Sequence, residues 1–352
     1  MSRQPWLSIL VPVYNVAPYL RECVESMLPQ IGPGVELLLL EDGSTDESPR
    51  ICTQLQARHA AVGLLRHERN RGLSAARNTL LEAATGQYLW FVDSDDRMLP
   101  GAVARLRPVI ARHQPDMVLC GYREGRRIRD GFSGAAHTLL HDREALVHGV
   151  FTSRRMYSWN RIVRRELWGT DLRFPAGRYF EDIMTTPWLC LRARSFYYAD
   201  EPWIDYRQRG DSIMALAMGC DGSFDRRMND DLAGALGGFR AAAAASLPQM
   251  STATALRIAE FCGRSFSGIG WRLLRARLVQ GEWRGFLTEL RRYRALCECD
   301  SPAEFRNVIA DALRERRLKI AVALGIMLLL SPVPRPPLPQ DRTGDAAAGE
   351  PR

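Results

Sequence analysis

Three carboxylates lie within four positions of one another in the stretch YLWFVDSDDRMLP, residues 88–100. They are Asp93, Asp95 and Asp96, and they directly follow an apolar run. Like charges packed this closely repel one another unless a cation lies among them, and hard oxygen ligands suit Mg²⁺ or Mn²⁺ better than zinc. The pattern therefore predicts a divalent metal site at the end of a buried strand.

Polar residues also end two earlier apolar runs. Asn15 follows LSILVPV, and Glu41 and Asp42 end VELLLLED. Taken singly, each is an ordinary turn or capping residue. Their repeated position at the ends of apolar runs favours a shared ligand site instead.

The elements that must position these side chains alternate regularly along the chain. Apolar runs predict strands at 7–13, 35–42, 62–68 and 88–93, and the segments between them have helical periodicity, with Gly86 expected to cap the last helix. Continuous apolar strands that alternate with helices form a mostly parallel sheet covered on both faces. Ligands of such sheets bind beyond the carboxyl ends of the strands, where the polar residues are expected to meet.

Five motifs, VPVYN, EDGSTD, NRGLSAARN, FVDSDD and FEDI, together resemble the family-two glycosyltransferases, which are inverting enzymes with the GT-A fold. The resemblance covers roughly residues 5–215. It implies a Rossmann-like α/β domain at residues 1–215, a sugar-transfer activity and a nucleotide-sugar donor. Neither GxxxxGK[ST] nor GxGxxG occurs, so a kinase, an ATPase or a dinucleotide dehydrogenase has little support.

The resemblance also implies roles for individual residues. Asp42 would hydrogen-bond the base, most often uracil in this family, and Asp93 and Asp95 would form the DxD motif, with Asp95 holding Mg²⁺ or Mn²⁺ and Asp93 contacting the ribose or the metal. The other residues expected at the nucleotide-sugar site are Pro12, Tyr14, Asn15, Glu41, Gly72 and Arg77.

The acceptor hydroxyl is too weak an acid to attack unaided, so a carboxylate must accept its proton. The segment GRYFEDIMTTPWL matches the acidic acceptor-side motif of the family, which implies Asp182 as the general base and Glu181 as the neighbour that orients the site. The alternative is that both acids simply begin a helix, where the helix dipole favours negative charge.

The segment FYYADEPWIDYRQRGDSIM predicts two short strands and an arginine-rich turn. Arg207 and Arg209 would approach the diphosphate there, or would be solvated surface residues. The QxxRW motif of processive relatives is absent, which favours a single addition in each encounter.

Beyond residue 215 the family motifs end. Residues 216–330 predict a helical C-terminal region rich in arginine, and the proline-rich residues 331–352 predict a disordered tail. The apolar run IAVALGIMLLL has 11 residues, too few to span a bilayer, and it follows the basic segment RERRLK. It either packs within the protein or lies on the inner face of the cytoplasmic membrane.

The expected function is metal-dependent transfer of a sugar from a nucleotide-sugar donor to a hydroxyl of a glycan or lipid-linked saccharide in bacterial polysaccharide biosynthesis. A UDP-sugar is the expected donor. Scattered cysteines and the lack of a signal-peptide pattern favour the cytoplasm. One alternative is a nucleotidyltransferase, although no glycine- and lysine-rich phosphate loop is present. A second alternative is a catalytically silent nucleotide-sugar binding module. Such a module would be expected to lack the DxD motif or the general base. The arginine-rich helices lack a nucleic-acid reader fold, so no nucleic-acid partner is expected.

Overall fold

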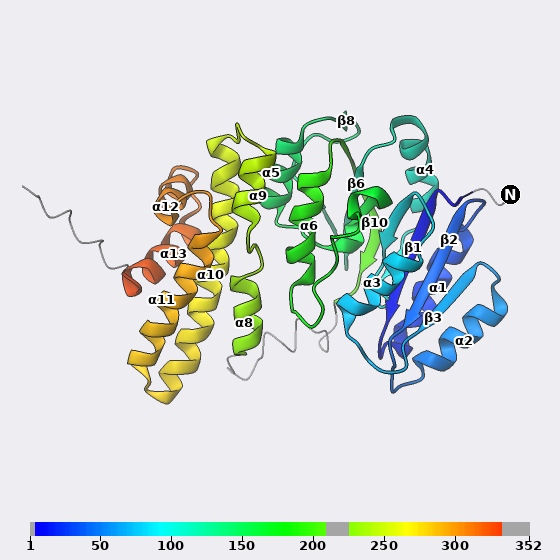
Figure 1. Cartoon of the computed structure of the whole chain (residues 1–352), viewed down its shortest axis with the longest axis horizontal. Helices are drawn as coiled ribbons and strands as arrows, with labels where there is room; N and C mark the ends of the chain where they lie inside the picture. The colour runs from blue at the N-terminus through cyan, green and yellow to red at the C-terminus, as the bar shows by residue number, and fades with distance from the viewer. Residues whose placement is uncertain (1–3, 209–224, 333–352) are drawn as a thin grey trace, which may run out of the picture.

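The computed structural model describes residues 4–208 and 225–332. Its strands are β1 (Leu7–Val13), β2 (Val35–Glu41), β3 (Val62–Arg66), β4 (Tyr88–Phe91), β5 (Arg97–Met98), β6 (Met117–Glu124), β7 (Arg127–Arg129), β8 (Leu139–Leu140), β9 (Arg161–Arg164) and β10 (Phe196–Tyr206). They form one sheet in the order β3-β2-β1-β4-β9-β6-β10-β5, with β7 paired to β6 and β8 paired to β10 (Figure 1).

The α-helices are α1 (Ala17–Met27), α2 (Ser48–Arg58), α3 (Leu73–Ala83), α4 (Ala102–His113), α5 (Arg143–Ser153), α6 (Glu181–Arg192), α8 (Arg226–Ala233), α9 (Phe239–Ser246), α10 (Thr252–Gln280), α11 (Trp283–Cys299), α12 (Phe305–Arg314) and α13 (Leu318–Leu330). Three short 3₁₀ helices are η1 (Leu28–Gln30), η2 (Ser158–Asn160) and η3 (Arg165–Trp168).

The first four strands, β1 to β4, run parallel, as their continuous apolar sequences predict. β9 then lies antiparallel between β4 and β6, so the sheet as a whole is mixed. Because β1, β2 and β4 are parallel neighbours, their carboxyl ends lie at one edge of the sheet. The polar residues that follow these three strands therefore gather at that edge.

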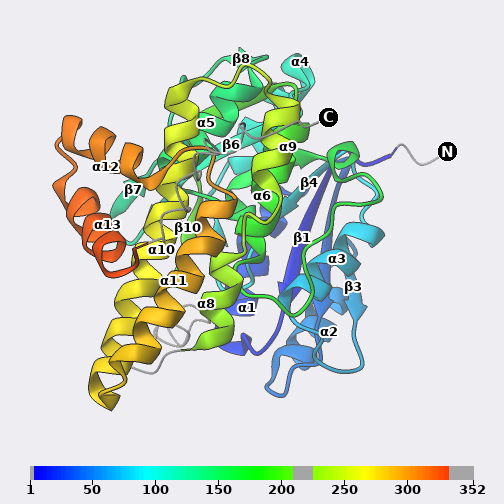
Figure 2. The same cartoon turned by 60° about the vertical axis from the view of Figure 1, so that its left-hand side comes forward.

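Successive residues of each strand point to opposite faces of the sheet. Ile9 and Trp90 belong to a buried cluster with α1, α2 and α4, whereas Leu10 and Phe91 belong to a second cluster on the other face. That second cluster continues through α3, α5 and α6 into α10, α11, α12 and α13. Both figures show these C-terminal helices gathered at one side of the molecule, away from β3 and α2 (Figures 1 and 2). The helical region thus shares a hydrophobic core with one face of the sheet.

Two local predictions were wrong. Gly86 does not cap α3, whose C-cap is Ala84 in an extended conformation. A Cβ on Gly86 would instead lie 2.5 Å from Ser8 Oγ and 2.7 Å from its backbone nitrogen, so glycine is needed where the chain passes close to β1. The segment after Ser195 forms one strand, β10, because a register shift after Tyr198 lets it continue along β6.

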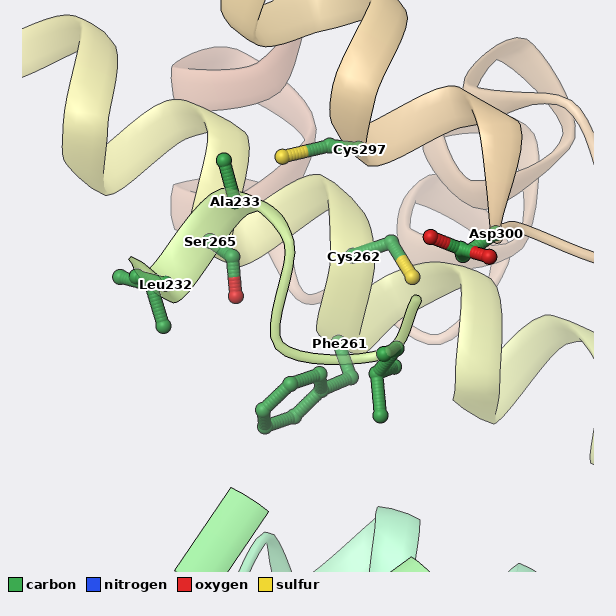
Figure 3. A pocket seen from close by; sticks show the side chains of 8 residues that line it. Leu232, Ala233, Phe261, Cys262, Ser265, Cys297 and Asp300 are labelled. Carbon is green, nitrogen blue, oxygen red and sulfur yellow. The ribbon is translucent and has the colours of Figure 1, made fainter. Parts of the chain in front are cut away.

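A small pocket lies between α8, α10 and α11, lined among others by Cys262, Cys297 and Asp300 (Figure 3). None of its lining residues is a predicted site residue. Burial raises the pKa of both thiols, that of Cys297 to about 12, so they are held protonated and unreactive. All seven cysteines in the described part of the chain are free.

Candidate active site

Arg77 joins three of the sequence motifs at the edge of the sheet. Its side chain, on α3, is 1% exposed. One guanidinium nitrogen donates to Asp93 Oδ1 at 3.0 Å, and the other donates to Glu181 Oε1 at 2.9 Å and to Asp182 Oδ1 at 2.8 Å. The guanidinium carbon lies 5.2 Å from the centroid of the Phe174 ring. Residues up to 105 positions apart are therefore fixed around one buried cation.

This cluster sets one cation against three carboxylates. Burial raises the pKa of Asp93 to about 6, with Asp95 and Asp182 adding to the effect and Arg77 opposing it. Burial and the nearby Asp182 raise the pKa of Glu181 to about 7. Burial alone would lower the pKa of Arg77, but its three carboxylate partners raise it above the ordinary value. The site therefore has excess negative charge to offer a further cation.

Ser158 orients the predicted base. Its hydroxyl and its backbone N–H both donate to the Asp182 carboxylate, the N–H to Oδ2 at 3.2 Å. Ser158 begins η2 and lies between Tyr157 and Trp159, whose rings stack with centroids 4.8 Å apart. The sequence analysis missed Ser158, because a single serine 24 positions from its partner has no distinguishing signal.

Arg207 holds the loop that carries the carboxylates. Its backbone N–H donates to Asp96 Oδ1 at 2.8 Å, its Nε donates to the Asp95 carbonyl at 3.0 Å, and its guanidinium pairs with Glu22 at 2.5 Å. Burial and the neighbouring aspartates raise the pKa of Asp96 well above its usual range. The predicted diphosphate contact of Arg207 stays a prediction, and Arg209 lies outside the described residues.

The donor chemistry of Asp93 and Asp95 fits Mg²⁺ or Mn²⁺. Both side chains offer carboxylate oxygens, and their mutual repulsion contributes to the raised pKa of Asp93. Sites for Mg²⁺ commonly use one or two carboxylates and complete the shell with substrate phosphates and water. Accordingly, residues 4–208 and 225–332 hold no group of three or more His, Cys, Asp or Glu side chains that could bind a metal unaided.

Asp42 directly follows β2 and is 1% exposed. Its Oδ1 accepts from the Arg71 backbone N–H at 3.0 Å and lies 2.5 Å from His67 Nδ1, and its Oδ2 accepts from the Gly72 N–H at 2.9 Å. Gly72 has φ +86° and precedes α3. The carboxylate thus fixes the turn that begins the Arg77 helix, a role that the sequence analysis did not foresee. Its contact with the base stays a prediction.

The remaining nucleotide-side residues differ in how far they reach solvent. Pro12 is buried within β1 and Glu41 within the end of β2, whereas the Tyr14 ring is 44% exposed. Asn15, at φ +49°, accepts from the Thr45 N–H at 2.8 Å and so ties the end of β1 to the loop after β2. Of these four, Tyr14 and Asn15 are the residues available to a ligand at the surface.

Residues 8–167 match the protein family described as Glycosyl transferase family 2. This match confirms the predicted resemblance to the family over these residues. Over 220 residues the chain is 35% identical to the uncharacterized glycosyltransferase EpsJ of Bacillus subtilis, covering 60% of this chain and 64% of EpsJ. Over 218 residues it is 30% identical to the glycosyltransferase GlyA of Streptococcus pneumoniae, covering 59% of this chain and 31% of GlyA. The match therefore spans less than two thirds of either relative.

Two solved structures share the fold of this chain. One is TarS of S. aureus in complex with UDP-GlcNAc, with a TM-score of 0.61, 21% identity and coverage of 88% of this chain and 91% of that structure. The other is the mannosyltransferase PcManGT of Pyrobaculum calidifontis in complex with GDP-Man and Mn²⁺, with a TM-score of 0.53, 16% identity and coverage of 94% and 86%. The predicted GT-A architecture with a C-terminal helical region is confirmed.

Replacing Arg77 with methionine should cost about 3–5 kcal/mol of the free energy of unfolding, because it leaves three carboxylates without their buried cation. Denaturant unfolding measures this loss. The control is Arg50→Met, which breaks an exposed ion pair with Glu47 and should cost about 0–1 kcal/mol. A similar small loss for Arg77→Met would show that the family 2 motifs are not joined through this side chain.

Replacing Asp42 with alanine should weaken nucleoside diphosphate binding by about 1–3 kcal/mol, because the buried donor of the base would lose its predicted acceptor. Isothermal titration calorimetry measures the change. Asp142→Ala is the matched control, since Asp142 caps α5 and is not a predicted site residue. An unchanged dissociation constant in Asp42→Ala would place this carboxylate outside the nucleotide site.

Proposed function

We propose that this chain is a metal-dependent inverting glycosyltransferase. It transfers a sugar from a nucleotide-sugar donor, of which UDP-sugars are the first candidates, to a hydroxyl of a glycan or lipid-linked saccharide in bacterial polysaccharide biosynthesis. We place this activity in the cytoplasm, in peripheral contact with the membrane. The observation that carries the proposal is the cluster of Asp93, Glu181 and Asp182 around buried Arg77 in a chain whose residues 8–167 match family 2.

In the proposed reaction, Asp182 accepts the proton of the acceptor hydroxyl as its oxygen attacks the anomeric carbon of the donor. The bond from that carbon to the diphosphate oxygen breaks, and attack from the opposite face inverts the configuration. Arg77 and Ser158 hold Asp182 in place, and Glu181 supplies a second carboxylate beside it. Asp93 and Asp95 would hold a divalent cation, which when bound neutralises charge on the diphosphate leaving group.

The contacts of Glu181 and Asp182 with Arg77 support this assignment. The family match ends at residue 167, before α6, so the roles of Glu181 and Asp182 stand on their resemblance to the acidic motif and on their contact with Arg77. Glu181, with its raised pKa, is the second candidate for the base. A nucleotidyltransferase would need neither carboxylate on the acceptor side, and a silent binding module would need no base at all.

Binding of UDP-sugars and GDP-sugars in the presence of Mn²⁺ tests the proposed donor. We expect calorimetry to show tighter binding of UDP-sugars. TarS was solved with UDP-GlcNAc and PcManGT with GDP-Man, so a preference for GDP-sugars would change the base but keep the reaction. Binding of neither class would contradict the proposal.

Stability should depend on pH through the same cluster. A carboxyl group whose pKa is raised by folding stabilises the fold while protonated, and that stability is lost as pH rises through the folded pKa. For Glu181 the loss should develop between pH 4.5 and about 7. In chelator, the free energy of unfolding of the wild type should fall relative to Glu181→Gln by about 2 kcal/mol over this range. A constant difference between the two proteins would show that Glu181 has an ordinary pKa.

A further inference from the structure

α13 exposes an apolar stripe along one side. Leu318, Val322, Ile326 and Leu329 are 59%, 57%, 37% and 82% exposed. Their spacing of four, four and three residues places all four on the same face of the helix. Four large apolar side chains in a row on one exposed face form a continuous patch, unlike single exposed apolar residues, which are common on protein surfaces.

The opposite face of α13 is firmly packed. Leu324 and Met327 are buried in the cluster shared with α10 and α12, and Ala321 is buried as well. At the start of the helix, Arg317 donates to Asp311 at 2.7 Å and also pairs with the buried Glu260 of α10. The helix is therefore held with the stripe facing outward. Both figures place α13 at the outer edge of the molecule, at the end opposite α2 and β3 (Figures 1 and 2).

Three exposed cations adjoin the stripe. Arg314 ends α12, Arg316 lies in the turn, and Lys319 is in the first turn of α13. Within the described residues none of the three forms an ion pair, whereas the one acid of this segment, Glu315, is paired with Arg257 and Arg317. Residues 320–330 contain no charged side chain. The surface thus combines unpaired positive charge at one end with apolar side chains along its length.

We propose that this surface, the α13 stripe with Arg314, Arg316 and Lys319, docks the chain on an anionic lipid bilayer. The apolar side chains enter the boundary between headgroups and acyl chains, and the three cations contact anionic headgroups. The charge of the surface favours this occupant over a second copy of the chain, because the same surface of a second copy would offer these cations no unpaired acid. No helix within residues 4–208 and 225–332 is long and apolar enough to cross a membrane.

The docking proposal rests on the proposed function in one respect: a lipid-linked acceptor would lie in a membrane, which gives the enzyme a reason to dock there. Its test therefore uses no donor and no transfer reaction. The full chain is sedimented with vesicles of phosphatidylcholine and phosphatidylglycerol in equal amounts, and separately with vesicles of phosphatidylcholine alone. We expect binding to the anionic vesicles that weakens as salt is added, and much weaker binding to the neutral ones.

Two variants test the two parts of the surface. Val322→Asp with Leu329→Asp should weaken vesicle binding roughly a hundredfold by removing the apolar contact. Arg314→Gln with Arg316→Gln should weaken it about 25-fold, at about fivefold for each cation. The matched controls are Ile128→Asp, at 67% exposure on β7, and Arg126→Gln with Arg127→Gln beside it, and both should bind as the wild type does.

Nucleotide-sugar binding and the melting temperature should be unchanged in both stripe variants, which separates a docking defect from a folding or donor-site defect. Equal binding to both kinds of vesicle, or no loss in Val322→Asp with Leu329→Asp, would overturn the proposal. Self-association without vesicles that this variant abolishes would assign the stripe to a second copy instead. A monomer that binds neither kind of vesicle would overturn it too.

Discussion

Replacing Asp182 with asparagine should lower turnover by roughly 10²–10⁴-fold while leaving donor affinity nearly unchanged. Asparagine keeps the shape of the side chain and still accepts a hydrogen bond from Arg77, but it cannot accept the proton of the acceptor. Both oxygens of Asp182 accept hydrogen bonds, so the amide must lose one of them, at a cost of about 1 kcal/mol in stability. Transfer kinetics, donor titration and thermal unfolding of the one variant separate these effects.

Asp225→Asn provides the control for Asp182→Asn, because Asp225 caps the first turn of α8 and is not a predicted site residue. It should change stability slightly and turnover not at all. If Asp182 were only a helix-terminal acid, its substitution would behave like this control, with a loss of about 0.3–1 kcal/mol in stability and turnover within a few-fold of the wild type. That result would move the search for the base to Glu181.

Removing divalent metal should reduce transfer by roughly 10²–10⁴-fold, because a bound cation supplies several kcal/mol of charge stabilisation to the leaving diphosphate. Added Mg²⁺ or Mn²⁺ should restore it. Among the carboxylates, Asp95→Asn should be more damaging than Asp96→Asn, since Asp96 is buried and already accepts from the Arg207 N–H, whereas Asp95 belongs to the DxD motif. The measurement is the initial rate of transfer against metal concentration.

The free energy of unfolding of the two variants separates a loss of stability from a loss of metal binding. Asp96→Asn alters the anchor of the loop and is expected to change stability, whereas Asp95→Asn is expected to change metal dependence. Full transfer activity in chelator would contradict the assignment of Asp93 and Asp95 as metal ligands. Equal metal dependence in Asp95→Asn and the wild type would move the metal to another pair of oxygens.

The parallel part of the sheet could be predicted because its strands are buried on both faces and are therefore apolar at most positions. Residues 37–40 are four consecutive leucines between Glu36 and Glu41, a run typical of a strand that is covered on both faces. The same logic correctly placed Asp42 and Asp93 at the carboxyl ends of β2 and β4, on either side of β1. It failed at Gly86, where the close approach of β1 decides the residue, since a contact distant in sequence leaves no local pattern.

The bridging role of Arg77 could not be read from its motif. An arginine in an amphipathic helix usually faces solvent. This one is buried because α3 packs on β1 and β2, and because Asp93 and Glu181 close around the guanidinium. Ser158 was missed for the same reason, because its partner comes from another element. The exposed stripe of α13 was also hidden, since an entirely apolar sequence does not show which of its faces is packed. Residue roles that depend on tertiary contacts need the structure.

Turnover of a panel of nucleotide sugars, followed as release of the nucleoside diphosphate with acceptor saccharide and Mn²⁺ present, tests the central claim most directly. The account predicts release from at least one nucleotide sugar by the wild type, with transfer of its sugar to the acceptor, and near-complete loss of both in Asp182→Asn. It would be contradicted if no nucleotide sugar were consumed, or if Asp182→Asn consumed the donor and glycosylated the acceptor as fast as the wild type.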